Sequence, residues 1–156
     1  MKILVAIDDS TFSRNALEET LKIIDLPKAT LLLLSVEEPV HISLASSMPS
    51  IFEDVPVLEM EFQSELIDIE EQRVMSVLDW AKNLCHQVGV KASTRIGYGD
   101  PKRVICRVAQ EDDCDLIVVG SHGCGQTGPN LLGSVSNYVV HRAQRPVLVV
   151  RKGVSP

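Results

Sequence analysis

The chain has 156 residues, of which 45% are hydrophobic and 23% charged, and its formal net charge is −6. This length fits one globular domain with a real core, and the composition excludes a largely disordered chain. Lysine and arginine occur singly or in pairs, whereas a nucleic-acid surface needs clustered cations, so we expect no nucleic-acid partner.

No apolar run approaches the roughly 18–20 residues of a membrane helix, so we expect no membrane partner either. The apolar stretch Ile3–Ile7 is too short for the core of a secretory signal. The cysteines show no metal-finger spacing, and we expect them to be buried free thiols of a cytoplasmic protein. They are Cys85, Cys106, Cys114 and Cys124.

The first half of the chain predicts two strands and one helix. The strands are Lys2–Ile7 and Ala29–Val36, and the helix between them is Ser13–Ile24, with Ser10 available as its N-cap. Continuous apolar runs of this kind are typical of strands buried on both faces of a parallel sheet. The segment Glu37–Leu58 has three prolines and no sustained period, which predicts a long loop, either a functional lid or a tolerated insertion.

The second half continues the same alternation. A helix is predicted over Glu59–Val88, followed by a weaker strand over Val90–Ile96. Asp100, an N-cap type, precedes Pro101 and indicates the start of a helix. The remaining elements are the strand Leu116–Val119, the helix Gly133–Ala143 and the strand Val147–Arg151.

The predicted order β-α-β-α-β-α-β-α-β indicates one α/β domain over residues 1–156, with right-handed crossovers. In such sheets, ligands bind beyond the carboxyl ends of the strands, near the point where the strand order reverses. Asp8, Asp9 and Gly120 all follow the carboxyl ends of predicted strands. We therefore expect the functional site at that edge.

A glycine-rich segment, Gly120–Ser134, follows the strand Leu116–Val119 and suits a loop that closes backbone amides around phosphates. Two nucleotide motifs match it by letter and fail. In the Walker A pattern, Gln126 stands where the phosphate-binding lysine is required. The G-x-G-x-x-G from Gly123 to Gly128 does not follow directly from a strand, and Pro129 follows it where a helix should open.

A third pattern is Gly120-x-x-Gly123, nine residues, then Gly133-Ser134, in which phosphates lie between backbone amides and the hydroxyls of Ser134 and Ser136. This spacing resembles the ATP-binding signature of the universal stress protein family. The resemblance extends over nearly the whole chain, apart from the predicted loop. It includes V-A-I-D-D-S near the N-terminus, L-L-S-V, G-D-P and the closing R-P-V-L-V-V-R.

The resemblance implies a doubly wound, five-stranded parallel sheet with helices on both faces, similar to the adenine-nucleotide α-hydrolase and Rossmann folds. It implies a homodimer formed through the last strand, Val147, Leu148, Val149 and Val150. It also implies a site for ATP. Asp8 would lie near the ribose and phosphates of that ATP and contact them through a bound Mg²⁺ or Mn²⁺. The implied ATP-binding residues are Ala6, Asp8, Val36, Gly120, His122, Gly123, Gly133, Ser134, Val135 and Ser136.

Two positions depart from the family pattern. Ala6 stands where many ATP-binding members have proline. Asp9 adds a second carboxylate where a neutral residue is common, and it would repel phosphate unless a cation lies between them.

Three other functions are compatible with parts of the sequence. The acidic pair Asp8-Asp9 resembles the start of a phosphoacceptor receiver domain, but Asp54 lies outside any predicted strand end and Arg145 replaces the expected lysine. No nucleophile–base pair marks an enzyme, so any ATP hydrolysis should be slow and the expected function is regulatory. A family member without nucleotide, acting as an interaction module, is the remaining alternative.

Overall fold

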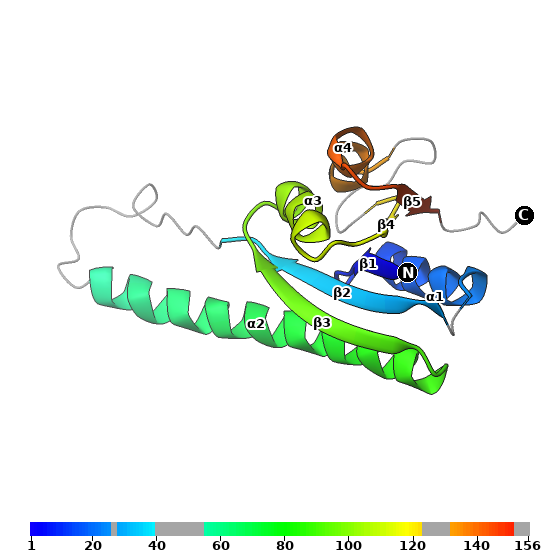
Figure 1. Ribbon diagram of the computed structural model, residues 1–156. Coiled ribbons are helices and arrows are strands. Elements are labelled where there is room, and N and C mark those ends of the chain that lie inside the picture. The colour runs from blue at the N-terminus through cyan, green and yellow to red at the C-terminus, as the bar shows by residue number, and fades with distance from the viewer. Residues whose placement is uncertain (26–27, 40–54, 123–131, 152–156) are drawn as a thin grey trace, which may run out of the picture.

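The computed structural model describes residues 1–25, 28–39, 55–122 and 132–151, with side chains omitted over 55–63. Five strands alternate with four helices (Figure 1). The strands are β1 (Lys2–Ala6), β2 (Thr30–Glu37), β3 (Lys91–Tyr98), β4 (Leu116–Gly120) and β5 (Val147–Val150). The helices are α1 (Thr11–Ile23), α2 (Val55–Gln87), α3 (Pro101–Glu111) and α4 (Ser134–Arg142).

The strands form one parallel sheet in the order β3-β2-β1-β4-β5, which confirms the predicted fold class. The central strand β1 pairs with β2 on one side, with Ile3 opposite Leu31, and with β4 on the other, with Ile3 opposite Leu116. The chain winds outward from β1 in both directions. The strand order therefore reverses between β1 and β4, the place where α/β sheets bind ligands.

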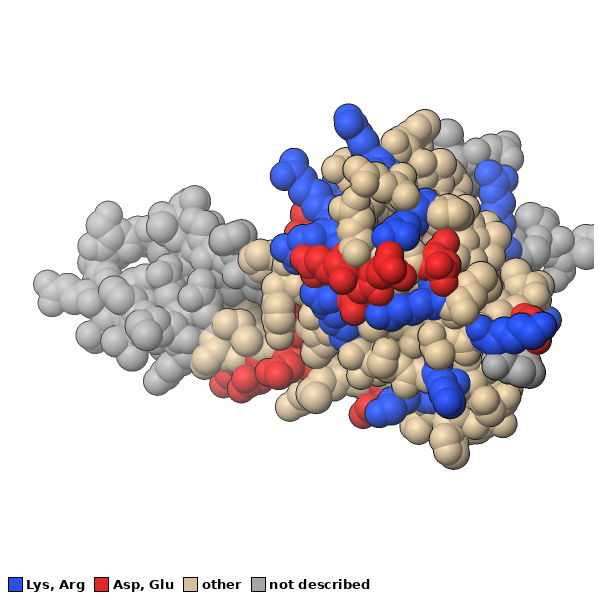
Figure 2. Space-filling model, viewed as in Figure 1, with Lys and Arg blue, Asp and Glu red and all other residues tan. Residues whose placement is uncertain are grey.

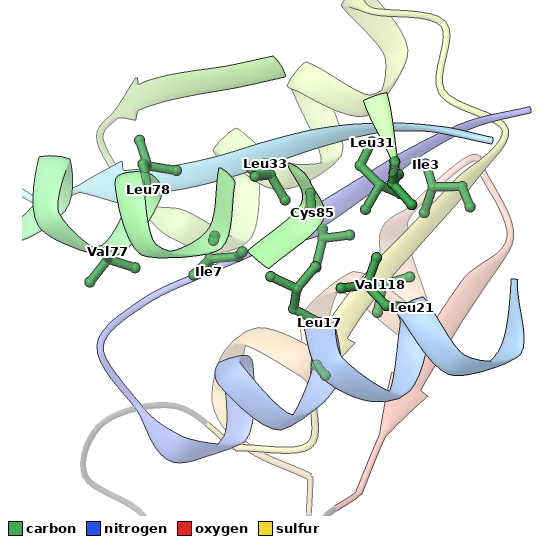
Figure 3. Packing of buried hydrophobic residues seen from close by; sticks show 14 of the residues in the cluster. Ile3, Ile7, Leu17, Leu21, Leu31, Leu33, Val77, Leu78, Cys85 and Val118 are labelled. Atoms are coloured by element: carbon green, nitrogen blue, oxygen red, sulfur yellow. The ribbon is translucent and has the colours of Figure 1, made fainter. Parts of the chain in front are cut away.

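Alternate residues of each central strand enter two separate cores, because successive side chains of a strand point to opposite faces. Val5 and Val118 pack with α1 and α2, whereas Leu4 and Ile117 pack with α3 and α4. Figure 3 shows the first core, where Leu17 and Leu21 of α1 and Val77 and Leu78 of α2 cover the sheet. Burial on both faces explains why these strands read as continuous apolar runs.

The helix starts follow their capping residues. The hydroxyl of Ser10 accepts a hydrogen bond from the Ser13 N–H, and the Asp100 carboxylate accepts one from the Lys102 N–H ahead of Pro101. Both N-caps were predicted and are confirmed.

The long helix α2 begins earlier than predicted. It starts at Val55, so the predicted loop Glu37–Leu58 is wrong at both ends, because Glu37 belongs to β2 and residues 55–58 belong to α2. Pro56 signalled a loop but lies in the first helical turn, where its missing N–H costs no intrahelical bond. Residues 40–54 lie outside the described part, and so does Asp54 of the receiver alternative.

Two of the predicted buried thiols are confirmed. Cys85 and Cys114 are buried and free, Cys106 is half-buried and free, and Cys124 lies outside the described residues. Burial raises the pKa of the Cys85 thiol to about 11, so this thiol stays protonated and unreactive at neutral pH.

Within the described ranges, no helix is both long and apolar enough to cross a lipid bilayer.

Candidate functional site

A cavity of about 510 Å³ opens at the carboxyl ends of β1, β2 and β4, where the strand order reverses. It collects residues from the β1–α1 turn, the end of β2, the middle of α2, the start of α3 and the start of α4. Nine of the ten predicted site residues line it: Ala6, Asp8, Val36, Gly120, His122, Gly133, Ser134, Val135 and Ser136. The tenth, Gly123, lies outside the described residues.

Asp8 is half-buried in the turn between β1 and α1, and hydrogen bonds fix its position. Its Oδ1 accepts a bond of 3.1 Å from the Ser10 N–H and a second bond from the Ser10 hydroxyl. Its backbone carbonyl accepts a 2.7 Å bond from the Ser13 hydroxyl. Ser10 caps α1, so Asp8 is not needed as the cap, and Oδ2 has no partner among the described residues. The turn therefore holds one carboxylate oxygen in place and leaves the other available to the cavity.

Gly120 ends β4 in direct contact with the first turn of α1. A Cβ placed on Gly120 would lie 2.9 Å from both the carbonyl carbon and the carbonyl oxygen of Phe12. Two backbone segments thus approach more closely than any side chain permits, which gives this glycine a packing role that sequence reasoning missed. The close approach brings the end of β4 next to the turn that carries Asp8.

The start of α4 is tied to the end of β4 by hydrogen bonds to the Ser121 carbonyl. The Gly133 N–H donates to it at 2.7 Å and the Ser136 hydroxyl at 2.8 Å. The Ser136 hydroxyl also approaches the Gly133 carbonyl at 3.0 Å, so its hydrogen ties the start of α4 to the end of β4 and is not available to an anion. The N–H groups of the first helical residues, Ser134 to Ser136, have no intrahelical acceptor. They and the helix dipole favour an anion at this point of the cavity.

His122 is held by its neighbours. Its Nδ1 lies 3.2 Å from the Ser121 hydroxyl oxygen, and its ring is 5.2 Å from the ring of Phe12. The Ser121 N–H donates to Val150, so it is not available to a ligand. His122 therefore offers the cavity its backbone N–H and one edge of a packed ring.

An apolar part of the cavity lies between the end of β2 and the start of α3. Sequence reasoning found Val36 but not its neighbours, because they come from separate elements with no shared motif. These residues are Leu34, Pro39, Pro101, Ile105 and Val119. Apolar surroundings of this kind suit the ring system of an organic ligand.

Acidic side chains outnumber basic ones along the cavity. The carboxylates are Asp8, Asp9, Glu38 and Glu70, and Arg73 of α2 is the one lysine or arginine among the described lining residues. Arg73 donates to Asp9 at 3.0 Å and to Glu70 at 2.5 Å. Sequence reasoning missed Arg73 because 64 residues separate it from Asp9. The unexplained charge of Asp9 signalled a nearby cation but not which one.

A resident metal ion would need several protein side chains placed around it. The described residues contain no group of three or more histidine, cysteine, aspartate or glutamate side chains placed to hold an ion. Among the described residues near the start of α4, Asp8 offers an unpartnered carboxylate oxygen. A divalent ion would fit if the bound anion and water supplied its other ligands, as Mg²⁺ commonly requires.

Known proteins are similar to this chain in both sequence and fold. The universal stress protein YxiE of Bacillus subtilis is 33% identical over 150 residues, which are 96% of this chain and 98% of that protein. The structure of MJ0577, a universal stress protein of Methanocaldococcus jannaschii, superposes with a TM-score of 0.79 at 27% identity, covering 99% of this chain and 97% of that one.

A universal stress protein family protein from Arabidopsis thaliana, solved with AMP bound, superposes with a TM-score of 0.70 at 26% identity, covering 99% and 93%. The universal stress protein family itself is matched by residues 1–151, nearly the whole chain. This chain therefore belongs to the universal stress protein family.

Proposed function

We propose that the cavity binds an adenine nucleotide, ATP by preference, and that the protein is a regulatory stress-response protein. One observation carries the proposal: an apolar slot, a carboxylate and a helix N-terminus line the same cavity at the reversal of strand order. Each matches one part of a nucleotide, namely base, ribose and phosphates. The relative from Arabidopsis thaliana with AMP bound supports the adenine base.

The proposed orientation follows from the polarity of the lining. The adenine ring lies against Leu34 and Ile105, where the backbone of Val36 at the end of β2 offers polar groups to the ring edge. The phosphates lie toward the α4 N-terminus, which supplies backbone N–H donors rather than cationic side chains. Asp8 lies between these two ends and is the candidate for contact with the ribose.

The charge of the lining favours a metal–nucleotide complex over a free nucleotide. Four carboxylates and one guanidinium give these lining residues an excess of three negative charges, so an unaccompanied polyphosphate would be repelled. Mg²⁺ or Mn²⁺ would neutralise part of the phosphate charge when bound. Asp8 is the side chain that would ligate it, through the Oδ2 that the turn leaves without a partner.

Nucleotide retention, rather than rapid hydrolysis, is the proposed activity. Several side chains of the described cavity that could accept a proton already contact other residues of the protein. Asp8 binds Ser10, Asp9 binds Arg73 and His122 packs against Phe12. The hydroxyls that lie beside these bases, Ser10 next to Asp8 and Ser121 next to His122, are buried. Occupancy by nucleotide would then act by favouring one conformation or partner over another. Free buried thiols suit the reducing cytoplasm as its location.

A homodimer through β5 belongs to the same proposal. β5 lies at one edge of the sheet, pairs with β4, and carries three half-buried apolar residues, Val147, Leu148 and Val149. An uncovered apolar edge favours pairing with a second chain. The Pro146 and Val150 carbonyls accept hydrogen bonds from the N–H groups of Ile117 and Ser121, so the backbone groups of even-numbered residues in β5 face β4. The N–H of Val149 therefore faces outward, away from β4.

Native mass spectrometry of freshly purified protein, with and without added ATP and Mg²⁺, tests both parts. We expect a dimer that gains the mass of one metal–nucleotide complex per chain. A protein that shows no bound nucleotide and no shift with ATP and Mg²⁺ contradicts nucleotide binding. Val149→Pro should remove one outward N–H and yield folded monomers, and a persistent dimer would contradict the β5 interface.

A further inference from the structure

A cation from a distant helix neutralises the second carboxylate of the β1–α1 turn. Asp8 and Asp9 are adjacent and both line the cavity, but they have different partners. Asp8 is bound by Ser10, whereas the Asp9 Oδ2 lies 3.0 Å from Nη1 of Arg73. The structure thus separates one carboxylate that keeps its charge toward the cavity from one whose charge is compensated.

Arg73 lies where α2 leaves the sheet. Val74, Val77 and Leu78 are buried in the core, whereas residues 64–73 are exposed or half-buried. Figure 1 shows the N-terminal half of α2 extending beyond the strands. The side chain of Arg73 is itself 49% exposed, so carboxylates rather than apolar packing hold its guanidinium in place.

Both terminal nitrogens of Arg73 are already engaged. Nη1 donates to Asp9 and Nη2 to Glu70, and both carboxylates line the cavity. This arrangement places the guanidinium as a bridge between the β1–α1 turn and α2. Its direct partners are protein carboxylates, so its effect on a ligand is transmitted through their charge.

We propose that Arg73 is a charge-compensating, positioning residue of the nucleotide site, which acts through Asp9 and makes the cavity tolerant of polyphosphates. The inference rests on the proposed function and deepens it. Without Arg73, the negative charge of Asp9 repels phosphate more strongly, and the repulsion grows with the number of phosphate groups. Arg73 therefore determines preference along the series adenosine, AMP, ADP and ATP.

Calorimetric binding of these four ligands, with Mg²⁺ present, tests the inference in the full-length protein. We expect Arg73→Gln to weaken ATP binding about fivefold, AMP binding less, and adenosine binding hardly at all, as suits a half-exposed ion pair. Arg73→Lys keeps the charge and should restore most of the ATP affinity. Arg107→Gln is the matched control, because it removes the same charge and an ion pair with Glu111 outside the cavity.

A double-mutant cycle separates action through Asp9 from direct contact with phosphate. In an Asp9→Asn background, Arg73→Gln should change ATP affinity clearly less than it does in wild type, because of its two carboxylate partners only Glu70 remains to be compensated. An equal loss with and without the Asp9 carboxylate means that Arg73 acts without Asp9, either by direct contact with phosphate or through Glu70, and overturns the inference. An equal loss for adenosine and ATP means a structural role and also overturns it.

The failure of the inference can be told apart from failure of the proposed function. Wild-type protein that binds none of the four ligands overturns the nucleotide proposal, and the inference falls with it. Wild-type protein that binds ATP, together with an Arg73→Gln variant that binds it equally well, overturns the inference alone.

Discussion

The two ends of the sheet carry charge in opposite ways. At the amino end, the Lys2 ammonium lies 3.2 Å from the Asp112 carboxylate, and Arg95 binds both Asp112 and Glu111. The Lys2 N–H donates to Asp115 at 2.7 Å. Figure 2 shows acidic and basic side chains side by side on the face that carries α3. These ion pairs fasten β1, β3 and α3 together and leave little charge uncompensated.

At the carboxyl end, four carboxylates share one guanidinium among the described cavity residues. Such an imbalance destabilises the folded protein slightly, because like charges repel at close range. This contrast fits the proposal that the amino end of the sheet serves stability and the carboxyl end serves binding. Substitutions at the two ends should therefore differ in how much they reduce stability and how much they reduce ligand binding.

The largest effect is expected at Gly120, where the carboxyl end depends on a close backbone approach. Gly120→Ala places a methyl group 2.9 Å from the Phe12 backbone, which must move. We expect a loss of about 3 kcal/mol in the free energy of unfolding, measured by urea denaturation, because overpacking costs this much. ATP binding should fall as well, since the turn carrying Asp8 shifts with α1.

Gly89→Ala is the matched control for the first prediction. Gly89 has a φ of +76° after α2, and a Cβ there meets no atom within 4 Å. Backbone strain alone should cost about 1 kcal/mol and leave ATP binding unchanged. Equal losses for the two variants would mean that the contact with Phe12 is not tight.

A smaller effect is expected at the amino end from Asp112→Asn. Burial alone would raise the pKa of Asp112, but hydrogen bonds from Arg95 and Lys2 outweigh it and lower the pKa below its usual range. We expect a loss of less than about 1 kcal/mol at pH 7, because the ion pairs are partly exposed to solvent. Nucleotide affinity should not change, since this cluster does not reach the cavity.

The pH dependence of this loss has a defined sign. A carboxyl group with a lowered pKa stabilises the folded state above its ordinary pKa of about 3.9. That stabilisation disappears as the pH falls through the lowered value. Urea denaturation should therefore show wild type and Asp112→Asn differing at pH 7 and converging toward pH 3. A difference that persists in acid would mean that Asp112 acts through its neutral hydrogen bonds.

The fold and much of the site were predictable because they depend on local signals. Continuous apolar runs predicted buried parallel strands, and the capping residues Ser10 and Asp100 predicted the helix starts, as found. The convergence of Asp8 and Gly120 on one cavity followed from the rule that carboxyl ends of parallel strands meet, whereas Val36 and Gly133 were expected from the family resemblance.

The missed features depend on contacts between distant elements. Nothing near Arg73 in the sequence shows that it reaches Asp9, because the pair forms only after α2 packs on the sheet. The tight contact of Gly120 with Phe12 is a property of two backbones and has no side-chain signature. The hydroxyl of Ser136 was assigned to phosphate because sequence does not show that the Ser121 carbonyl lies 2.8 Å away.

The smallest effect is expected at Glu37, where β2 ends beside the acidic part of α2. Its Oε1 is buried and has no hydrogen-bond partner among the described residues. Burial foremost, and then the charges of Glu71 and Glu70, raise the pKa of this carboxyl group. Ionised Glu37 is therefore slightly unfavourable in the folded state, and Glu37→Gln should stabilise the protein at pH 7.5 by a few tenths of a kcal/mol.

The sign at Glu37 is the reverse of that at Asp112. With a raised pKa, the group favours folding most below its ordinary pKa of about 4.3, and this contribution is lost as the pH rises through the raised value. The advantage of Glu37→Gln should thus appear between pH 4 and pH 7.5, measured by urea denaturation against wild type. Glu71→Gln should give part of the same gain, because it removes one repelling neighbour. If the stability advantage of Glu37→Gln does not vary with pH, the Glu37 charge carries no cost to folding. The two ends of the sheet would then differ in the geometry of their contacts and not in the energetic cost of their charges.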